Sequence, residues 1–140
     1  MLVVTPNFHF NGQCKQAIEL YKKAFGAEVK SLFCYSDANP QDYILTDEDE
    51  KDFVYHAEII IGNQRIMLND GTDDSFLKGN SISTVITFET ANDVKTAFEI
   101  MADGASIIHP MISTTYSSCF VSLIDKYGMR WELMTEQTEV

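Results

Sequence analysis

The chain has 140 residues, 45% of them hydrophobic and 22% charged, which is typical of one globular domain with a single good core. Its 21 acidic and 10 basic side chains give a formal net charge of −11, which argues against nucleic acid and anionic membranes as partners. No apolar run approaches the roughly 20 residues that span a bilayer, and the start lacks the basic region of a signal peptide, so we expect a cytoplasmic location.

The first half of the chain predicts one helix and four strands. Apolar residues spaced at i, i+3, i+4, i+7 and i+11 line one face of a helix over 14–25, which Gly26 is expected to end. The acidic run 47–50 is typical of a solvated loop, and Gly62-Asn63 predicts a hairpin turn. The strands are expected over residues 2–10, 29–35, 53–61 and 65–69.

The second half repeats this order after a linker. Residues 70–80 are rich in Asp, Gly and Asn and separate a first module, 1–69, from a second, 81–140. The second helix is expected to begin near Thr90 or Asn92 and to end at Gly104, which lies 78 positions after Gly26. The strands of this module are expected over residues 82–88, 106–109, 116–124 and 129–134.

Each half therefore has the order strand, helix, strand, strand, strand. Three consecutive strands disfavour a doubly wound parallel sheet, which needs regular alternation. We predict an α+β fold in which two βαβββ modules form curved mixed sheets around a concave cavity, with the helices outside. Paired modules commonly hold a site between them.

Four phrases in this order resemble a known family. They are residues 17–27, 56–59, 67–70 and 125–131, which read AIELYKKAFGA, HAEI, MLND and DKYGMRW. They are similar to the PhnB-like branch of the vicinal oxygen chelate superfamily, which includes glyoxalase I, bleomycin-resistance proteins and extradiol dioxygenases. The resemblance implies the glyoxalase/bleomycin-resistance-like fold and a homodimer, but one fold hosts many activities.

The resemblance also implies four positions from which metal-using members bind a divalent ion, on the first and last strand of each module. Glu132 matches the final carboxylate ligand, and Met67 is its counterpart in the first module. The first-strand positions fall near Ser83 and, in the first module, on Thr5 or Pro6. Because a stable site needs about three or four good ligands, we predict neither a complete metal centre nor any other cofactor.

Two histidines are candidate site residues. If Phe8 and Phe10 face the core, strand alternation places His9 on the opposite face, toward the predicted cavity. His56 is a candidate acid or base, because an imidazole titrates near neutral pH. For both, a strand histidine that is half in water or bonded to a neighbour is the structural alternative. His109, just before Pro110, is expected at the surface.

The remaining cavity candidates are Tyr116, Cys119, Trp131 and Met67. Tyr116 begins a Tyr-Ser pair where PhnB-like relatives carry Trp-Gly. No base in register with Cys119 is evident, and three cysteines without a CxxC spacing are typical of reduced thiols. Trp131 and Met67 either line an apolar pocket or belong to the core.

No two glycines lie within two positions of each other, and the sequence lacks three glycine-containing motifs, which disfavours some activities. GxGxxG loops and P-loops are absent, so we do not expect a methyltransferase that uses the glycine-rich loop of typical methyl-donor folds. The GxSxG nucleophile elbow is also absent, which argues against the α/β-hydrolase mechanism. Our hypothesis is a protein that binds a small organic molecule between its modules without a complete metal site.

Two alternatives stay open. One is a metal-dependent lyase, isomerase or dioxygenase that uses Glu132 with His9 or His56. The other is a structural protein whose concavity is filled by side chains such as Phe8, Met67 and Trp131. Pairing of the modules within one chain and their exchange between two chains are equally compatible with the sequence.

Overall fold

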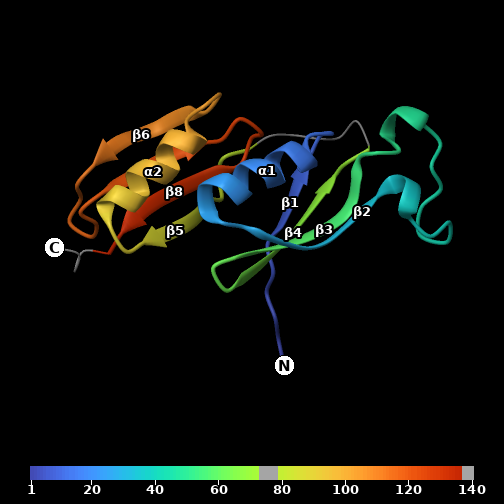
Figure 1. The fold of residues 1–140 in the computed structure, drawn as a ribbon, viewed down its shortest axis with the longest axis horizontal. Helices are drawn as coiled ribbons and strands as arrows, with labels where there is room; N and C mark the ends of the chain where they lie inside the picture. The colour runs from blue at the N-terminus through green and yellow to red at the C-terminus, as the bar shows by residue number, and fades with distance from the viewer. Residues whose placement is uncertain (73–78, 137–140) are drawn as a thin grey trace. The chain divides into compact units, whose positions relative to one another are not determined.

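The computed structural model describes residues 1–72 and 79–136 and divides into two compact units, Met1–Phe76 and Leu77–Val140. Each unit is a four-stranded mixed sheet with one helix packed on it (Figure 1). The α+β class and the βαβββ order of each half, both predicted from the sequence, are confirmed. No helix of the described residues is long and apolar enough to cross a membrane.

The first unit has the strand order β1-β4-β3-β2, in which β1 runs parallel to β4 and the other pairs are antiparallel. Its elements are β1 (Asn7–Phe10), α1 (Cys14–Phe25), β2 (Glu28–Cys34), β3 (Val54–Ile61) and β4 (Gln64–Asp70). As predicted, α1 ends at Gly26, whose φ of 67° is left-handed and whose N–H donates to Lys22 O. The hairpin turn at Gly62 is also confirmed.

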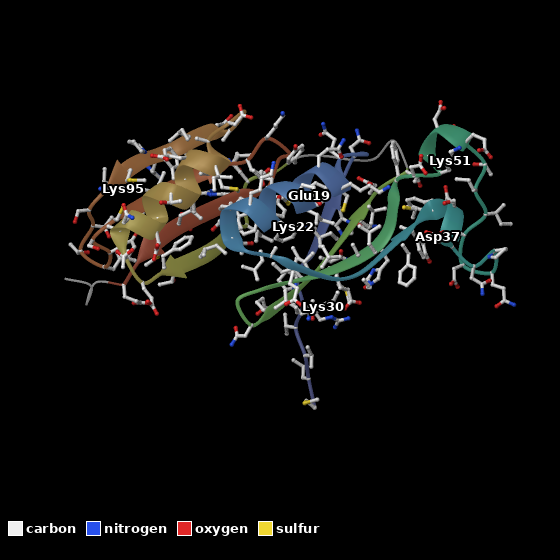
Figure 2. The ribbon with its side chains drawn as sticks, viewed as in Figure 1. Glu19, Lys22, Lys30, Asp37, Lys51 and Lys95 are labelled. Atoms are coloured by element: carbon white, nitrogen blue, oxygen red, sulfur yellow. The ribbon has the colours of Figure 1, made fainter. Side chains whose placement is uncertain are left out.

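The outer face of α1 is charged. Figure 2 shows Glu19 and Lys22 on this face, where Lys22 Nζ donates to Glu19 Oε1 at 3.2 Å. Both side chains are largely exposed, so this ion pair contributes little to stability. The opposite face of α1 is buried, and its residues are Cys14, Ala17, Ile18 and Tyr21.

Two predictions for the first unit were wrong in part: where the first strand begins, and the structure of the acidic run. The first strand begins at Asn7 instead of residue 2, and residues 2–4 are exposed. Pro6 has no N–H to donate to a ladder, and its carbonyl accepts from Met67 N at 2.9 Å just before the pairing begins. The acidic run is not all loop, because Glu48–Glu50 form a short 3₁₀ turn capped by the Asp47 side chain.

Asp70 joins the helix and two strands of the first unit. One carboxylate oxygen accepts from the N–H groups of Gly12 and Cys14, at 2.8 and 3.0 Å, and the other accepts from Val54 N at 2.8 Å. The side chain is 1% exposed. The N-terminus of α1 is therefore capped by a residue far along the chain.

The second unit repeats the topology with the strand order β5-β8-β7-β6. Its elements are β5 (Thr84–Phe88), α2 (Ala91–Met101), β6 (Ser106–Ile112), β7 (Phe120–Ile124) and β8 (Arg130–Thr135). Thr90 caps α2, as predicted, by accepting from Asp93 N at 3.1 Å. The expected end at Gly104 is wrong, because α2 ends at Met101 and Gly104 lies beyond it, with φ 72°.

Three strand boundaries in the second unit differ from prediction by two or more residues, and the first is the start of β5 at Thr84 instead of residue 82. The third strand of this unit begins at Phe120 instead of residue 116, because the Ser117 hydroxyl donates to Cys119 O and accepts from Thr135 N. These side-chain bonds compete with a regular ladder. The strand that starts at Ser106 continues to Ile112 instead of ending at residue 109.

The two sheets correspond in register. Asn7 of β1 pairs with Met67, and Val85 of β5 pairs with Glu132. Asn7 and Val85 are 78 positions apart, the same separation as Gly26 and Gly104. The correspondence of Met67 with Glu132 that the sequence suggested therefore holds in the structure.

Candidate functional site

One face of each sheet is covered by its helix. The polar side chains described below lie on the other face. In β8, the buried Trp131, Leu133 and Thr135 alternate with half-buried Arg130, Glu132 and Met134. In β4, Ile66, Leu68 and Asp70 are likewise buried. Cross-strand partners share a face, so the register identifies the neighbours of each polar residue.

Four polar residues form what we call the Glu132 cluster: Ser83, Ser122, Arg130 and Glu132. Ser122 of β7 is the cross-strand partner of Glu132. Ser83 Oγ donates to Glu132 Oε1 at 2.9 Å, and Arg130 Nη2 lies 3.8 Å from Glu132 Oε2. Arg130 Nη1 also donates to Asn80 O at 2.8 Å.

Two buried polar atoms of this cluster have no hydrogen-bond partner among the described residues: Ser122 Oγ and Arg130 Nε. Ser122 is 0% exposed. A buried hydroxyl and a buried N–H without partners are unfavourable in a folded protein, typically by about 1–3 kcal/mol each. Such atoms are the groups that a bound molecule would satisfy.

The first unit has a related arrangement with the carboxylate on a different strand. Arg65 of β4 corresponds to Arg130 of β8, since each lies two residues before Met67 or Glu132. Glu58 of β3 is the cross-strand partner of Met67. The carboxylate therefore lies on β8 in one unit and on β3 in the other, next to an arginine in both.

Glu58 binds two cationic or polar neighbours. Arg65 Nε donates to Glu58 Oε1 at 2.6 Å, and His56 Nε2 lies 2.9 Å from Glu58 Oε2. The hydrogen bond from Arg65, followed by that from His56, lowers the pKa of Glu58 from its ordinary 4.5 to about 2. The carboxylate is therefore ionised throughout the neutral range.

The family's four metal-ligand positions do not fit a divalent ion. Asn7 and Val85 are equivalent positions of the two units and lie 78 residues apart. Thr5 and Ser83 have the same separation, so Thr5 and not Pro6 is the equivalent of Ser83. The donor set is then one carboxylate, one thioether and two hydroxyls, and the carboxylate already faces Arg130. Within the described residues, no group of three His, Cys, Asp or Glu side chains is placed to hold a metal.

The other predicted site residues are dispersed. His9 is exposed on β1, and Phe8 contacts Tyr21 of α1, so His9 lies opposite the helix as predicted. Trp131 is fully buried on the helix side of β8, where its Nε1 donates to Asp125 Oδ2 at 2.8 Å. It therefore belongs to the core and not to the Glu132 cluster.

Tyr116 and Cys119 also lie away from Glu132. Tyr116 precedes β7, is 52% exposed and contacts the Phe120 ring edge-on. Cys119 is 4% exposed beside the hydroxyls of Ser117 and Thr135, which hydrogen-bond to its backbone. His109 is exposed, as predicted, although it lies within β6 and not at its end.

Sequence reasoning missed five polar residues: Glu58, Arg65, Asn69, Ser122 and Arg130. One signal was available, because His56 and Glu58 are two residues apart and so share a strand face. The repeat also sets Arg65 against Arg130. The pairing of Ser122 with Glu132 depends on strand register, which a single sequence does not reveal.

Comparison with known proteins identifies the family of this chain. A family model described as 3-demethylubiquinone-9 3-methyltransferase matches residues 3–134. The chain belongs to this family. Protein YjdN of Escherichia coli (strain K12) is 24% identical over 134 residues, which are 91% of this chain and 91% of YjdN.

Solved structures extend the likeness. The putative 3-demethylubiquinone-9 3-methyltransferase, PhnB protein, from Bacillus cereus is 26% identical, with a TM-score of 0.80 over 96% of this chain and 99% of that one. The fosfomycin resistance protein FosX from Listeria monocytogenes shares the fold at 12% identity, with a TM-score of 0.62 over 96% of this chain and 90% of FosX. Together with the family match, these likenesses point to the vicinal oxygen chelate superfamily.

Proposed function

We propose that this protein is a PhnB-like member of the superfamily that binds a small, neutral organic molecule at the Glu132 cluster, without a complete metal centre. The unsatisfied Ser122 Oγ and Arg130 Nε are the observation that carries this proposal. Buried polar atoms without partners are uncommon in folded proteins, and a ligand that pairs with them removes their penalty.

The chemistry of the cluster favours a neutral ligand with both acceptor and donor groups. Arg130 Nε donates, the Ser122 hydroxyl donates or accepts, and Glu132 Oε2 accepts. An anion would be repelled by the Glu132 carboxylate and by the net charge of −11. A carbonyl oxygen beside a hydroxyl group matches these three atoms.

Hydroxyacetone is a suitable probe, because it joins a carbonyl and a hydroxyl on adjacent carbons. In ¹H–¹⁵N correlation spectra we expect it to shift the amide signals of Ser122 and Glu132, whereas acetate, an anion of similar size, should shift them far less. Ser122→Ala should weaken hydroxyacetone binding about fivefold or more. Ser81→Ala, an exposed serine of the same unit, is the matched control.

Two results would overturn the proposal. One is hydroxyacetone binding that Ser122→Ala leaves unchanged. The other is near-stoichiometric divalent metal in protein purified without chelators, lost on Glu132→Ala, which would establish the metal-dependent lyase, isomerase or dioxygenase alternative. The family's printed name describes a methyl transfer, but a glycine-rich methyl-donor loop is absent from the sequence, so we do not propose that activity.

We also propose that the protein forms a homodimer. The edge strand β2 exposes Val29 and Leu32, which are 38% and 36% exposed. An exposed apolar edge strand is typically covered in a native protein. Light scattering at micromolar concentration should give twice the chain mass of 15.8 kDa, and a monomer mass would contradict this.

A further inference from the structure

We propose that the first unit carries a second ligand site, the His56 cluster, which takes a small aromatic molecule bearing two hydroxyl groups. The His56 cluster is formed by His56, Glu58, Arg65 and Asn69 on the sheet face opposite α1. It shares no residue with the Glu132 cluster, so the two proposals stand or fall separately.

Strand register brings the cluster together. Asn69 of β4 pairs with His9 of β1, and His56 of β3 pairs with Phe33 of β2. His56 and Asn69 each lie one residue beyond the paired Ala57 and Leu68, on adjacent antiparallel strands. They therefore occupy neighbouring positions on one face, where side chains start about 5 Å apart.

The hydrogen bond between His56 and Glu58 determines which nitrogen of the neutral imidazole is free to bind a ligand. The ionised Glu58 carboxylate only accepts hydrogen bonds, so the His56 Nε2 that faces it at 2.9 Å must carry a proton. In the neutral imidazole, Nδ1 is then left as an acceptor. The side chain is 35% exposed, so a small molecule has access to it.

A second acceptor lies beside it. Asn69 Oδ1 is buried and has no hydrogen-bond partner among the residues that the structure describes. Two acceptors on adjacent strands call for a ligand with two donors. Phe33, 51% exposed and paired with His56, offers a ring face against which an aromatic ligand would pack.

Glu58 acts in this site as a positioning residue. It holds the imidazole in one tautomer without touching the ligand, and Arg65 Nε holds Glu58 in turn at 2.6 Å. Other groups that face His56 on this sheet are the neutral Asn69 and Phe33, with His9 one strand further away.

The test uses resorcinol, which has two hydroxyls, and 1,3-dimethoxybenzene, in which a methyl group replaces each hydroxyl hydrogen so that no donor remains. Long-range ¹H–¹⁵N spectra of the imidazoles should show His56 as the Nε2–H tautomer, with Nδ1 shifting as resorcinol is added. Dimethoxybenzene should bind at least tenfold more weakly. Asn69→Ala and His56→Phe should each weaken resorcinol binding about fivefold or more.

Matched variants separate this site from other effects. Glu58→Gln should mix the two tautomers of His56 and weaken resorcinol binding, a spectroscopic change that a purely structural residue would not produce. His109→Phe, an exposed histidine on β6 of the other unit, should leave resorcinol binding unchanged. Equal binding of both probes, an Nδ1–H tautomer in the wild-type protein, or full affinity in Asn69→Ala would overturn the proposal.

Discussion

Replacing Asp70 by Ala should destabilise the first unit by about 4 kcal/mol. The carboxylate accepts from three backbone N–H groups at 2.8 to 3.0 Å, and hydrogen bonds to a charged group each contribute about 1.5–3 kcal/mol. The three contributions overlap, and water should reach the half-buried Gly12 N–H in the variant, so the total falls below a simple sum. Since native domains are stable by about 5–15 kcal/mol, this loss is large.

Asp70→Asn is a second variant that removes only part of these hydrogen bonds. One amide oxygen can still accept from Gly12 and Cys14, but the amide NH₂ then faces Val54 N–H, donor to donor. We expect a loss of about 2 kcal/mol, half that of the alanine variant. The order of stability should therefore be wild type, Asn, Ala.

The assay must separate the two units. Trp131 is the only tryptophan, so its fluorescence follows the second unit alone during urea unfolding. Amide hydrogen exchange at Gly12, Cys14 and Val54 reports the first unit directly, and these amides should exchange fastest in the Ala variant. Asp52→Ala, at an exposed aspartate, is the control substitution. The reasoning would be refuted if the free energy of unfolding of Asp70→Ala, like that of Asp52→Ala, lay within about 0.5 kcal/mol of the wild-type value.

Three further outcomes are expected. The lowered pKa of Glu58 means that its stabilisation is complete above its ordinary pKa of 4.5 and is lost as the pH falls toward about 2, so Glu58→Gln should flatten the acid limb of a plot of Tm against pH. Cys34 should be the one thiol that reacts quickly with a disulfide reagent, because the other two are buried; a Cys34→Ser protein that still reacts quickly would contradict this. Gly12→Ala should destabilise more than Gly26→Ala in urea unfolding, because both have positive φ but only at Gly12 does a Cβ meet a side chain, at 2.8 Å.

Local patterns predicted the helices and the repeat well. The apolar spacing of 14–25, the glycine at 26 and the cap at Thr90 act over a few residues, so the sequence alone reveals them. Strand ends were less predictable. Ser117 moves the start of β7 through hydrogen bonds to Cys119 and to Thr135, and the second of these lies 18 positions away.

The site depends more strongly on distant pairing. Ser122 is unremarkable in sequence, and only its pairing with Glu132 makes its buried hydroxyl a candidate ligand contact. Trp131 shows the opposite case. An aromatic residue next to Glu132 in sequence points to the other face of β8, because strand neighbours alternate, so adjacency in the chain is misleading there.

The position of the carboxylate in each unit links the two proposed sites. In the first unit Met67 takes the last-strand position and Glu58 supplies the acid from the paired strand, whereas in the second unit Glu132 takes that position and its partner is the serine Ser122. An arginine two residues before the last-strand position accompanies both carboxylates. The exchange leaves unsatisfied acceptors in the first unit, at Asn69, and unsatisfied donors in the second, at Arg130. A carboxylate beside an arginine thus occurs on two surfaces with different unsatisfied groups, and we expect these surfaces to select different ligands.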